Sequence, residues 1–127
     1  MHHVHADDVA QAFEAAVVNR DAAAGEDFNV VAPSALNVRG YLQIGASWFG
    51  QTAVLRPVTW DEFRRGTDDE AAQTSWDHLV RNHCFSIEKA RTLLGYTPKY
   101  EPEDAVLESV RWLIDHEQLD VPNPLTV

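Results

Sequence analysis

Cysteine is almost absent from this chain of 127 residues, in which Cys84 is the single example. One cysteine cannot form a disulfide within the chain, so the fold does not depend on such a bond. Proteins held in a reducing compartment commonly use cysteine this sparingly. We therefore expect a cytoplasmic location.

Long apolar runs are also missing. The longest run covers only a few residues, whereas a membrane-spanning helix needs about 20. The first residues lack both the basic stretch and the apolar stretch of a signal peptide. These absences argue against a membrane partner and against a secretory leader.

Positive charge is scarce. Ten lysines and arginines stand against 20 aspartates and glutamates, which gives a formal net charge of −10 and an isoelectric point near 4.8. Such a chain repels phosphate backbones and anionic membrane surfaces. We expect no nucleic-acid partner.

Local motifs for catalysis and cofactor binding are lacking. The six glycines do not have the spacing of a G-x-G-x-x-G turn or of a P-loop. His3 and His5 would share one face of a strand and could hold a metal, but a third ligand is not evident. Cys84 follows His83, yet sequence neighbours rarely point at each other and no oxyanion loop is recognisable nearby. We predict no catalytic, cofactor-binding or metal-binding residue in this chain.

Apolar patterning is present and predicts a mainly helical chain. Helices are expected over residues 7–19, 34–50, 60–65, 69–80, 87–94 and 102–116. An aspartate suits the cap of the first, Ser34 starts the second, Thr67-Asp68-Asp69 could cap the fourth and Ser86 the fifth, which Gly95 would end in the left-handed conformation. Short strands are expected at the start of the chain, ending at Val4, and at 28–31 and 53–58. The predicted fold class is α/β, mostly helical with two or three short strands. Residues 1–119 would form one domain and 120–127 a flexible tail.

Two or three strands are too few for a free-standing doubly wound sheet. The chain therefore looks like the end of an α/β protein rather than a whole one. Unpaired strand edges would favour a homodimer or a strand-swapped oligomer.

Four segments in order strengthen this interpretation. They are HVHADDVA at 3–10, FNV at 28–30, SIEKAR with LLGYTP at 86–98, and the acidic-to-tryptophan helix at 103–112. Together they resemble the C-terminal part of the extended short-chain dehydrogenase/reductase family, which contains the NAD-dependent nucleotide-sugar epimerases and dehydratases. The resemblance covers most of residues 3–116.

This resemblance implies a substrate-binding portion that is inactive alone. In the family, the N-terminal Rossmann half carries the glycine-rich turn for NAD and a Tyr-x-x-x-Lys pair, and this sequence has neither. The expected partners are that missing half and a nucleotide-sugar. An arginine after a late strand often contacts the sugar-nucleotide phosphates in the family, and Arg56 is the nearest match here.

Two alternatives stay open. Arg56, Arg64 and Arg65 form the one basic cluster, and surrounding carboxylates could pair with them instead of a ligand anion. The whole chain could also be a stand-alone small α/β binding or protein-interaction module without catalysis.

Overall fold

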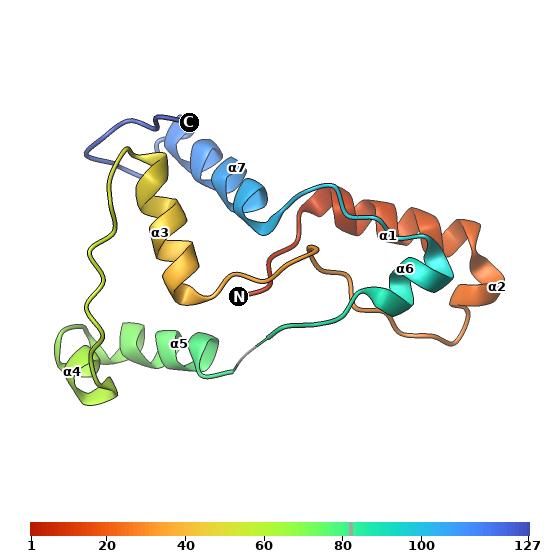
Figure 1. Ribbon diagram of the computed structural model, residues 1–127, viewed down its shortest axis with the longest axis horizontal. Coiled ribbons are helices and arrows are strands. Elements are labelled where there is room, and N and C mark those ends of the chain that lie inside the picture. Colours follow the sequence, from red (N-terminus) through yellow and green to blue (C-terminus); the bar gives the residue numbers. More distant parts are fainter. Residues whose placement is uncertain (82) are drawn as a thin grey trace.

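The protein was analysed as a computed structural model that describes residues 1–81 and 83–127. Over those residues, helices alternate with long extended segments (Figure 1). The helices are α1 (Ala6–Val18), α2 (Arg20–Ala23), α3 (Val38–Trp48), α4 (Trp60–Arg65), α5 (Asp69–Leu79), α6 (Glu88–Leu94) and α7 (Pro102–Asp115).

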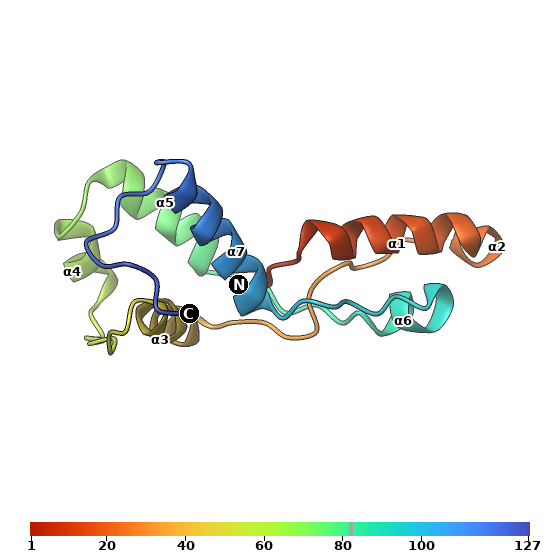
Figure 2. The same ribbon diagram turned by 90° about the horizontal axis from the view of Figure 1, so that it is seen from above.

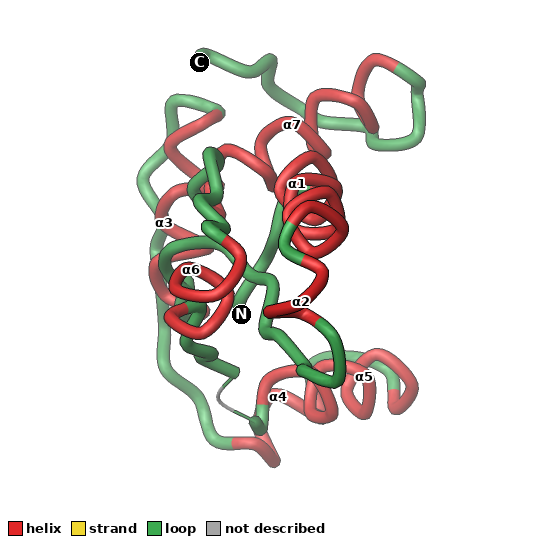
Figure 3. Tube along the Cα trace, turned by 90° about the vertical axis from the view of Figure 1, so that its right-hand side faces the viewer, coloured by secondary structure: helices red, strands yellow, loops and turns green. Residues whose placement is uncertain are grey.

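The prediction of an α/β fold is wrong. The described residues contain helices and loops but no strand (Figure 3). Residues 28–31 and 53–58 run outside any helix, as does Val4, but none of them joins a ladder. A strand exists only when a neighbour takes up its backbone groups. Here the N–H of Ala32 donates to the carbonyl of His3 at 3.1 Å, and this isolated bond does not make a sheet.

Most of the expected helices are confirmed, although some begin at other residues. Asp68 caps α5 by accepting from the N–H of Ala71 at 2.8 Å, as its position predicts. Gly95 ends α6 in the left-handed conformation with φ 72°. The third helix begins later than expected, because Asn37 rather than Ser34 caps it, by accepting from the N–H of Gly40 at 2.7 Å.

The cap of α1 is a histidine rather than an aspartate. The Nδ1 atom of His5 accepts a hydrogen bond from the N–H of Asp7 at 3.1 Å. Asp8 is thereby free to turn inward, where it is 1% exposed. Its two carboxylate oxygens accept from the backbone N–H groups of Lys99 at 2.8 Å and Tyr100 at 3.2 Å. The acidic start of α1 thus fixes the segment that leads into α7.

A small core lies where α1 packs beside α6, with α2 at the end of the pair (Figures 1 and 2). Its buried members are Ala12, Ile87, Ala90 and Tyr96, against which Phe28, Val30 and Val31 pack. Tyr96 is fully buried, and its hydroxyl donates to the carbonyl of Val31 at 3.1 Å. This core unites the N-terminal third of the chain with residues 86–100.

The other helices form looser pairs away from this core. Helix α3 contacts α7, and α4 contacts α5 through Trp60 and Trp76, whose ring centroids lie 4.8 Å apart. Residues 49–59 link the two pairs as an extended segment (Figure 1). At the C-terminal end, the N–H of Thr126 donates to the carbonyl of Trp48 at 2.7 Å. The expected flexibility of residues 120–127 stays a prediction.

Burial is incomplete for a chain of this mass. The accessible surface is 9127 Å², whereas a compact monomer of 14.3 kDa would expose about 6,800 Å². Several large apolar side chains are among the exposed residues: on α1, Phe13 is 71% exposed and Val17 is 78% exposed. They lie four residues apart and form, with Val18, a stripe that we call the α1 stripe. None of the described helices has the length and apolar character that crossing a membrane requires.

Candidate functional site

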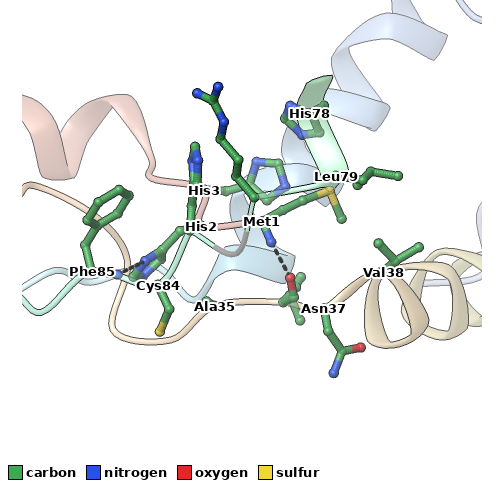
Figure 4. A pocket seen from close by; sticks show the side chains of 13 residues that line it. Met1, His2, His3, Ala35, Asn37, Val38, His78, Leu79, Cys84 and Phe85 are labelled. Carbon is green, nitrogen blue, oxygen red and sulfur yellow. Dashed lines mark hydrogen bonds between the residues drawn. The ribbon is translucent and has the colours of Figure 1, made fainter. Parts of the chain in front are cut away.

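A hollow of about 530 Å³ opens where the first residues of the chain meet the start of α3 and the end of α5 (Figure 4). Three parts of the chain that are distant in sequence supply its walls, namely residues 1–3, residues 35–38, and described residues at and after the end of α5 (78, 79, 81 and 83–85). Its lining side chains include four histidines, one arginine and one cysteine: His2, His3, His78, His83, Arg81 and Cys84. It is the candidate binding site of the described chain.

His2 ties the walls of this hollow together. One ring nitrogen, Nδ1, accepts from the backbone N–H of Phe85 at 3.1 Å. The other, Nε2, lies 2.9 Å from the carbonyl of Ala32. Because a carbonyl only accepts, we assign the proton to Nε2 and a neutral imidazole to His2. Both nitrogens are thus engaged, and the role of His2 is to hold the walls in place.

His3 differs because its Nε2 atom is buried and has no hydrogen-bond partner. Its ring lies beside that of Tyr41, with 5.8 Å between the centroids. Burial lowers the pKa of His3, and nearby positive charge, including that of His78, lowers it further. The ring is therefore uncharged at neutral pH. A buried polar atom without a partner is uncommon in proteins and calls for an explanation.

Arg56, the substrate-binding residue predicted from the resemblance, lies outside this hollow. It belongs to the extended segment between α3 and α4, and its side chain is 76% exposed. Its Nη1 atom forms an ion pair with Oε1 of Glu62 at 2.8 Å. The predicted contact with a nucleotide-sugar stays a prediction.

The other two arginines of the basic cluster also meet acidic neighbours. The Nε atom of Arg64 donates to Asp69 at 3.0 Å, and that of Arg65 donates to the carbonyl of Asp61 at 3.0 Å. These residues line a shallow hollow of about 520 Å³. The carboxylates there reduce the attraction that the arginines would offer to an anionic ligand.

His3 and His5 do not converge. The Nε2 atom of His5 lies 2.8 Å from a carboxylate oxygen of Glu108, and its ring stacks on Tyr100 at 3.8 Å. Its other nitrogen caps α1. No cluster of three or more histidine, cysteine or acidic side chains suited to a metal occurs in the part of the chain that the structure describes.

His83 and Cys84 both line the hollow, but they are not shown to act as a pair. The ring of His83 packs against Phe85, with the centroids 5.7 Å apart, and Cys84 is free and exposed. No hydrogen bond joins the two side chains in the described structure, so the geometry does not make a nucleophile with its base.

Sequence reasoning missed the gathering of four histidines around one hollow. His78 and His83 are five residues apart, which places them on different faces of a single helix. In the structure α5 ends at Leu79, so His83 lies outside the helix and periodicity does not apply to it. No local pattern could have found a cluster that tertiary contacts assemble.

Comparison with known proteins adds no assignment: no protein-family model, curated protein or solved structure matches the chain.

Proposed function

We propose that this chain is the substrate-side portion of an NAD-dependent nucleotide-sugar epimerase or dehydratase of the extended short-chain dehydrogenase/reductase type. On this proposal it acts only together with a Rossmann half that binds NAD. The chain contributes substrate contacts, and the other half contributes the cofactor and the proton-transfer residues.

Incomplete burial is the observation that carries the proposal. The chain exposes roughly 2,300 Å² more than a compact monomer of its mass would, and its total is 9127 Å². A stable protein–protein interface buries about 1,600 Å² in total, shared between both partners. The apolar α1 stripe is part of this surplus. A chain that leaves this much surface exposed resembles one portion of a larger protein, whose remaining portion would cover that surface.

The way the resembling segments pack is consistent with this proposal. Hydrogen bonds join residues 3–10 to residues 97–100, through Asp8, and to residues 103–112, where Glu108 meets His5. Asn29 donates to the carbonyl of Ser86 at 3.4 Å. The four segments that carry the resemblance therefore form one connected unit, which is expected if they descend from one folded part.

NAD does not fit this chain by itself. Its six glycines lack the spacing that lets a backbone approach a pyrophosphate. Each tyrosine is followed four positions later by a residue other than lysine, so the proton-transfer pair is missing as well. We accordingly assign no hydride-transfer step to these residues.

Arg56 remains the proposed phosphate contact of the complete enzyme. Its side chain is exposed and bound to Glu62, so a sugar-nucleotide phosphate would have to displace that carboxylate. Exposed ion pairs contribute only about 0–1 kcal/mol. Replacing the Glu62 carboxylate by a phosphate therefore costs little free energy. Arginine is suited to it because the guanidinium can engage two phosphate oxygens together.

A binding or protein-interaction module without catalysis is the second candidate. The α1 stripe favours it too, since exposed apolar patches mark interaction surfaces. On either proposal we place the protein in the cytoplasm, because its one cysteine is free and exposed and an oxidising compartment would leave it reactive.

The intact mass of the polypeptide in its source tests the proposal first. We expect a mass above 14.3 kDa by a cofactor-binding unit of about 100–200 residues. A native mass of 14.3 kDa would instead favour the interaction module.

Sedimentation of the 127-residue chain is the second test. We expect self-association at micromolar concentration, and Phe13→Ser should weaken it because this removes the largest member of the α1 stripe. Leu119→Ser is the matched control, because Leu119 is exposed but lies beyond α7. A monomer that unfolds cooperatively at high dilution would overturn the proposal that the chain is a part.

A further inference from the structure

The hollow in Figure 4 is lined by side chains that can carry positive charge, which is unusual for so acidic a protein. Aspartate and glutamate outnumber lysine and arginine by 20 to 10 in the chain. Yet the titratable side chains of this lining are histidines, one arginine and one cysteine, and no carboxylate is among the described lining residues. The walls can therefore become positive, but they offer a ligand no negative charge.

The Nε2 atom of His3, which has no hydrogen-bond partner, is a second and independent observation that points to a ligand in this hollow. Its Nε2 atom is buried without a partner, and an imidazole nitrogen in that state loses the hydrogen bond it would make in water. An oxygen of a bound ligand would supply the missing acceptor. Engaging it requires a small turn of the ring, because Nε2 is covered in the structure.

The surrounding groups decide which ligand oxygen suits the site. The imidazole of His78 acts on His3 as a positive charge. Arg81 and His83 come from the chain after α5, and Tyr41 of α3 contributes the ring beside His3. Every ionic group known to face His3 thus favours a negative ligand. A cation would meet repulsion and, within the described residues, no ready set of metal ligands.

We propose that this hollow binds a phosphoryl oxyanion, held by His3, His78 and Arg81, and that His3 takes up a proton when the anion binds. The inference does not depend on the function proposed above, because it rests on the lining alone. Phosphate oxygens accept several hydrogen bonds at once and pair well with arginine and protonated histidine. A volume of about 530 Å³ accommodates a phosphate or pyrophosphate group with room to spare.

The proton uptake follows from the direction of the His3 shift. Burial and positive neighbours lower the pKa of His3, and an anion beside the ring would raise it. Binding should therefore strengthen as the pH falls through the ordinary histidine range near 6.5. Each unit by which the ligand raises the pKa contributes up to about tenfold in affinity at low pH.

Calorimetric titration of the 127-residue chain with pyrophosphate, at pH 6.0 and at pH 8.0, tests the proposal. We expect about tenfold tighter binding at the lower pH. His3→Phe should weaken binding at pH 6.0 by about tenfold or more. His3→Gln keeps a donor near the position of Nε2 but cannot titrate, so it should retain binding and lose most of the pH dependence. His116→Phe, at the C-terminal end of α7 and outside the lining of the hollow, is the matched control and should change neither.

Inorganic phosphate serves as a second probe, because it separates a site for one phosphoryl group from a site for two. If phosphate binds as tightly as pyrophosphate, the hollow is a site for one phosphoryl group, and the proposal is supported in that form. The proposal is overturned if neither anion binds, if His3→Phe leaves binding intact, or if Zn²⁺ binds more tightly than either anion.

Imidazole resonances of the wild-type chain provide a test that does not rely on a variant that folds. Followed by NMR over pH 5–8, the pKa of His3 should rise when pyrophosphate saturates the site. An unchanged His3 titration in the presence of bound pyrophosphate would contradict the proposed contact.

Discussion

Asp8 shows how one side chain can serve two distant parts of a chain. Its carboxylate is buried at the start of α1 and accepts backbone hydrogen bonds from Lys99 and Tyr100, more than 90 residues away. Hydrogen bonds to a charged acceptor are stronger than neutral ones, and these two N–H groups would lose their partner without it. Asp8 is therefore a structural clamp.

Replacing Asp8 should cost far more than replacing its neighbour. We expect Asp8→Asn to lower the free energy of unfolding by about 1.5–3 kcal/mol, because the amide presents a donor to one of the two N–H groups. Asp7→Asn is the matched control and should cost less than about 0.5 kcal/mol. Asp7 is exposed, and its carboxylate meets the Tyr100 hydroxyl at 3.3 Å and lies 3.9 Å from Nδ1 of His5. Urea denaturation measures both. Equal losses of unfolding free energy in the two variants would show that the hydrogen bonds of Asp8 to residues 99 and 100 do not add to the stability.

Tyr96 makes the stability depend on alkaline pH. Burial, and then the negative charge of Asp8, raises the pKa of Tyr96 from 10.0 to about 12. The folded chain keeps this proton where the unfolded chain loses it, so the contribution is complete below pH 10 and disappears as the pH rises to 12. Over this window we expect a loss of up to about 1.4 kcal/mol per pH unit.

Chemical denaturation at pH 9.5, 10.5 and 11.5 measures this loss. Tyr96→Phe should show a smaller slope and a cost near 1 kcal/mol at pH 8, because it gives up the bond to Val31. Tyr41→Phe, a half-buried tyrosine outside this core, should keep the wild-type slope. Identical slopes for the wild type and Tyr96→Phe would refute the assignment.

At the scale of elements, substitutions at two glycines distinguish the effect of backbone strain from the effect of packing. A Cβ atom added at Gly95 or at Gly45 would meet nothing within 4 Å, so neither substitution causes a clash. Gly95 ends α6 with a φ of 72°, whereas Gly45 lies inside α3. Only the first position needs the left-handed region that glycine reaches without cost.

Alanine at these two positions should have opposite effects. We expect Gly95→Ala to destabilise the chain by about 1–2 kcal/mol through backbone strain. Gly45→Ala should stabilise it by about 0.5–1 kcal/mol, because alanine restricts the unfolded chain and favours the helix. Thermal unfolding followed by circular dichroism compares them directly. Destabilisation by both would indicate that Gly45 is covered in solution.

The ends of helices were predictable wherever local chemistry decides them. Asp68 and Gly95 could be identified from sequence because a cap and a left-handed glycine act within a few residues. The start of α1 was not predictable in the same way. His5, Asp7 and Asp8 all offered acceptors, and the distant segment at 99–100 determined which one would cap the helix.

At the scale of the whole molecule, the fold class could not be read from the chain. The extended segments at 28–31 and 53–58 have strand-like composition, but composition does not supply the neighbour that a ladder requires. The candidate site escaped prediction for a similar reason. Its walls come from residues 1–3, residues 35–38, and described residues at and after the end of α5 (78, 79, 81 and 83–85), and only tertiary contacts bring these together.

Charge and exposed surface oppose each other in this molecule. The net charge of −10 makes two copies repel, while the α1 stripe favours their contact. Salt screens the repulsion, with a Debye length near 10 Å at 0.1 M, but leaves apolar burial intact. The self-association expected in sedimentation should therefore be stronger at 0.5 M NaCl than at 0.05 M.

The clamp at Asp8 can form only late in the synthesis of the chain. Its partners at residues 99 and 100 leave the ribosome long after α1 has formed. At a rate of about 5–20 residues per second, roughly 5 to 18 seconds separate the two events. During that interval the Asp8 carboxylate lacks its backbone partners, and the side of α1 that packs against α6 is uncovered. The order in which the residues are made thus leaves the core around α1 incomplete until residue 100 has been added.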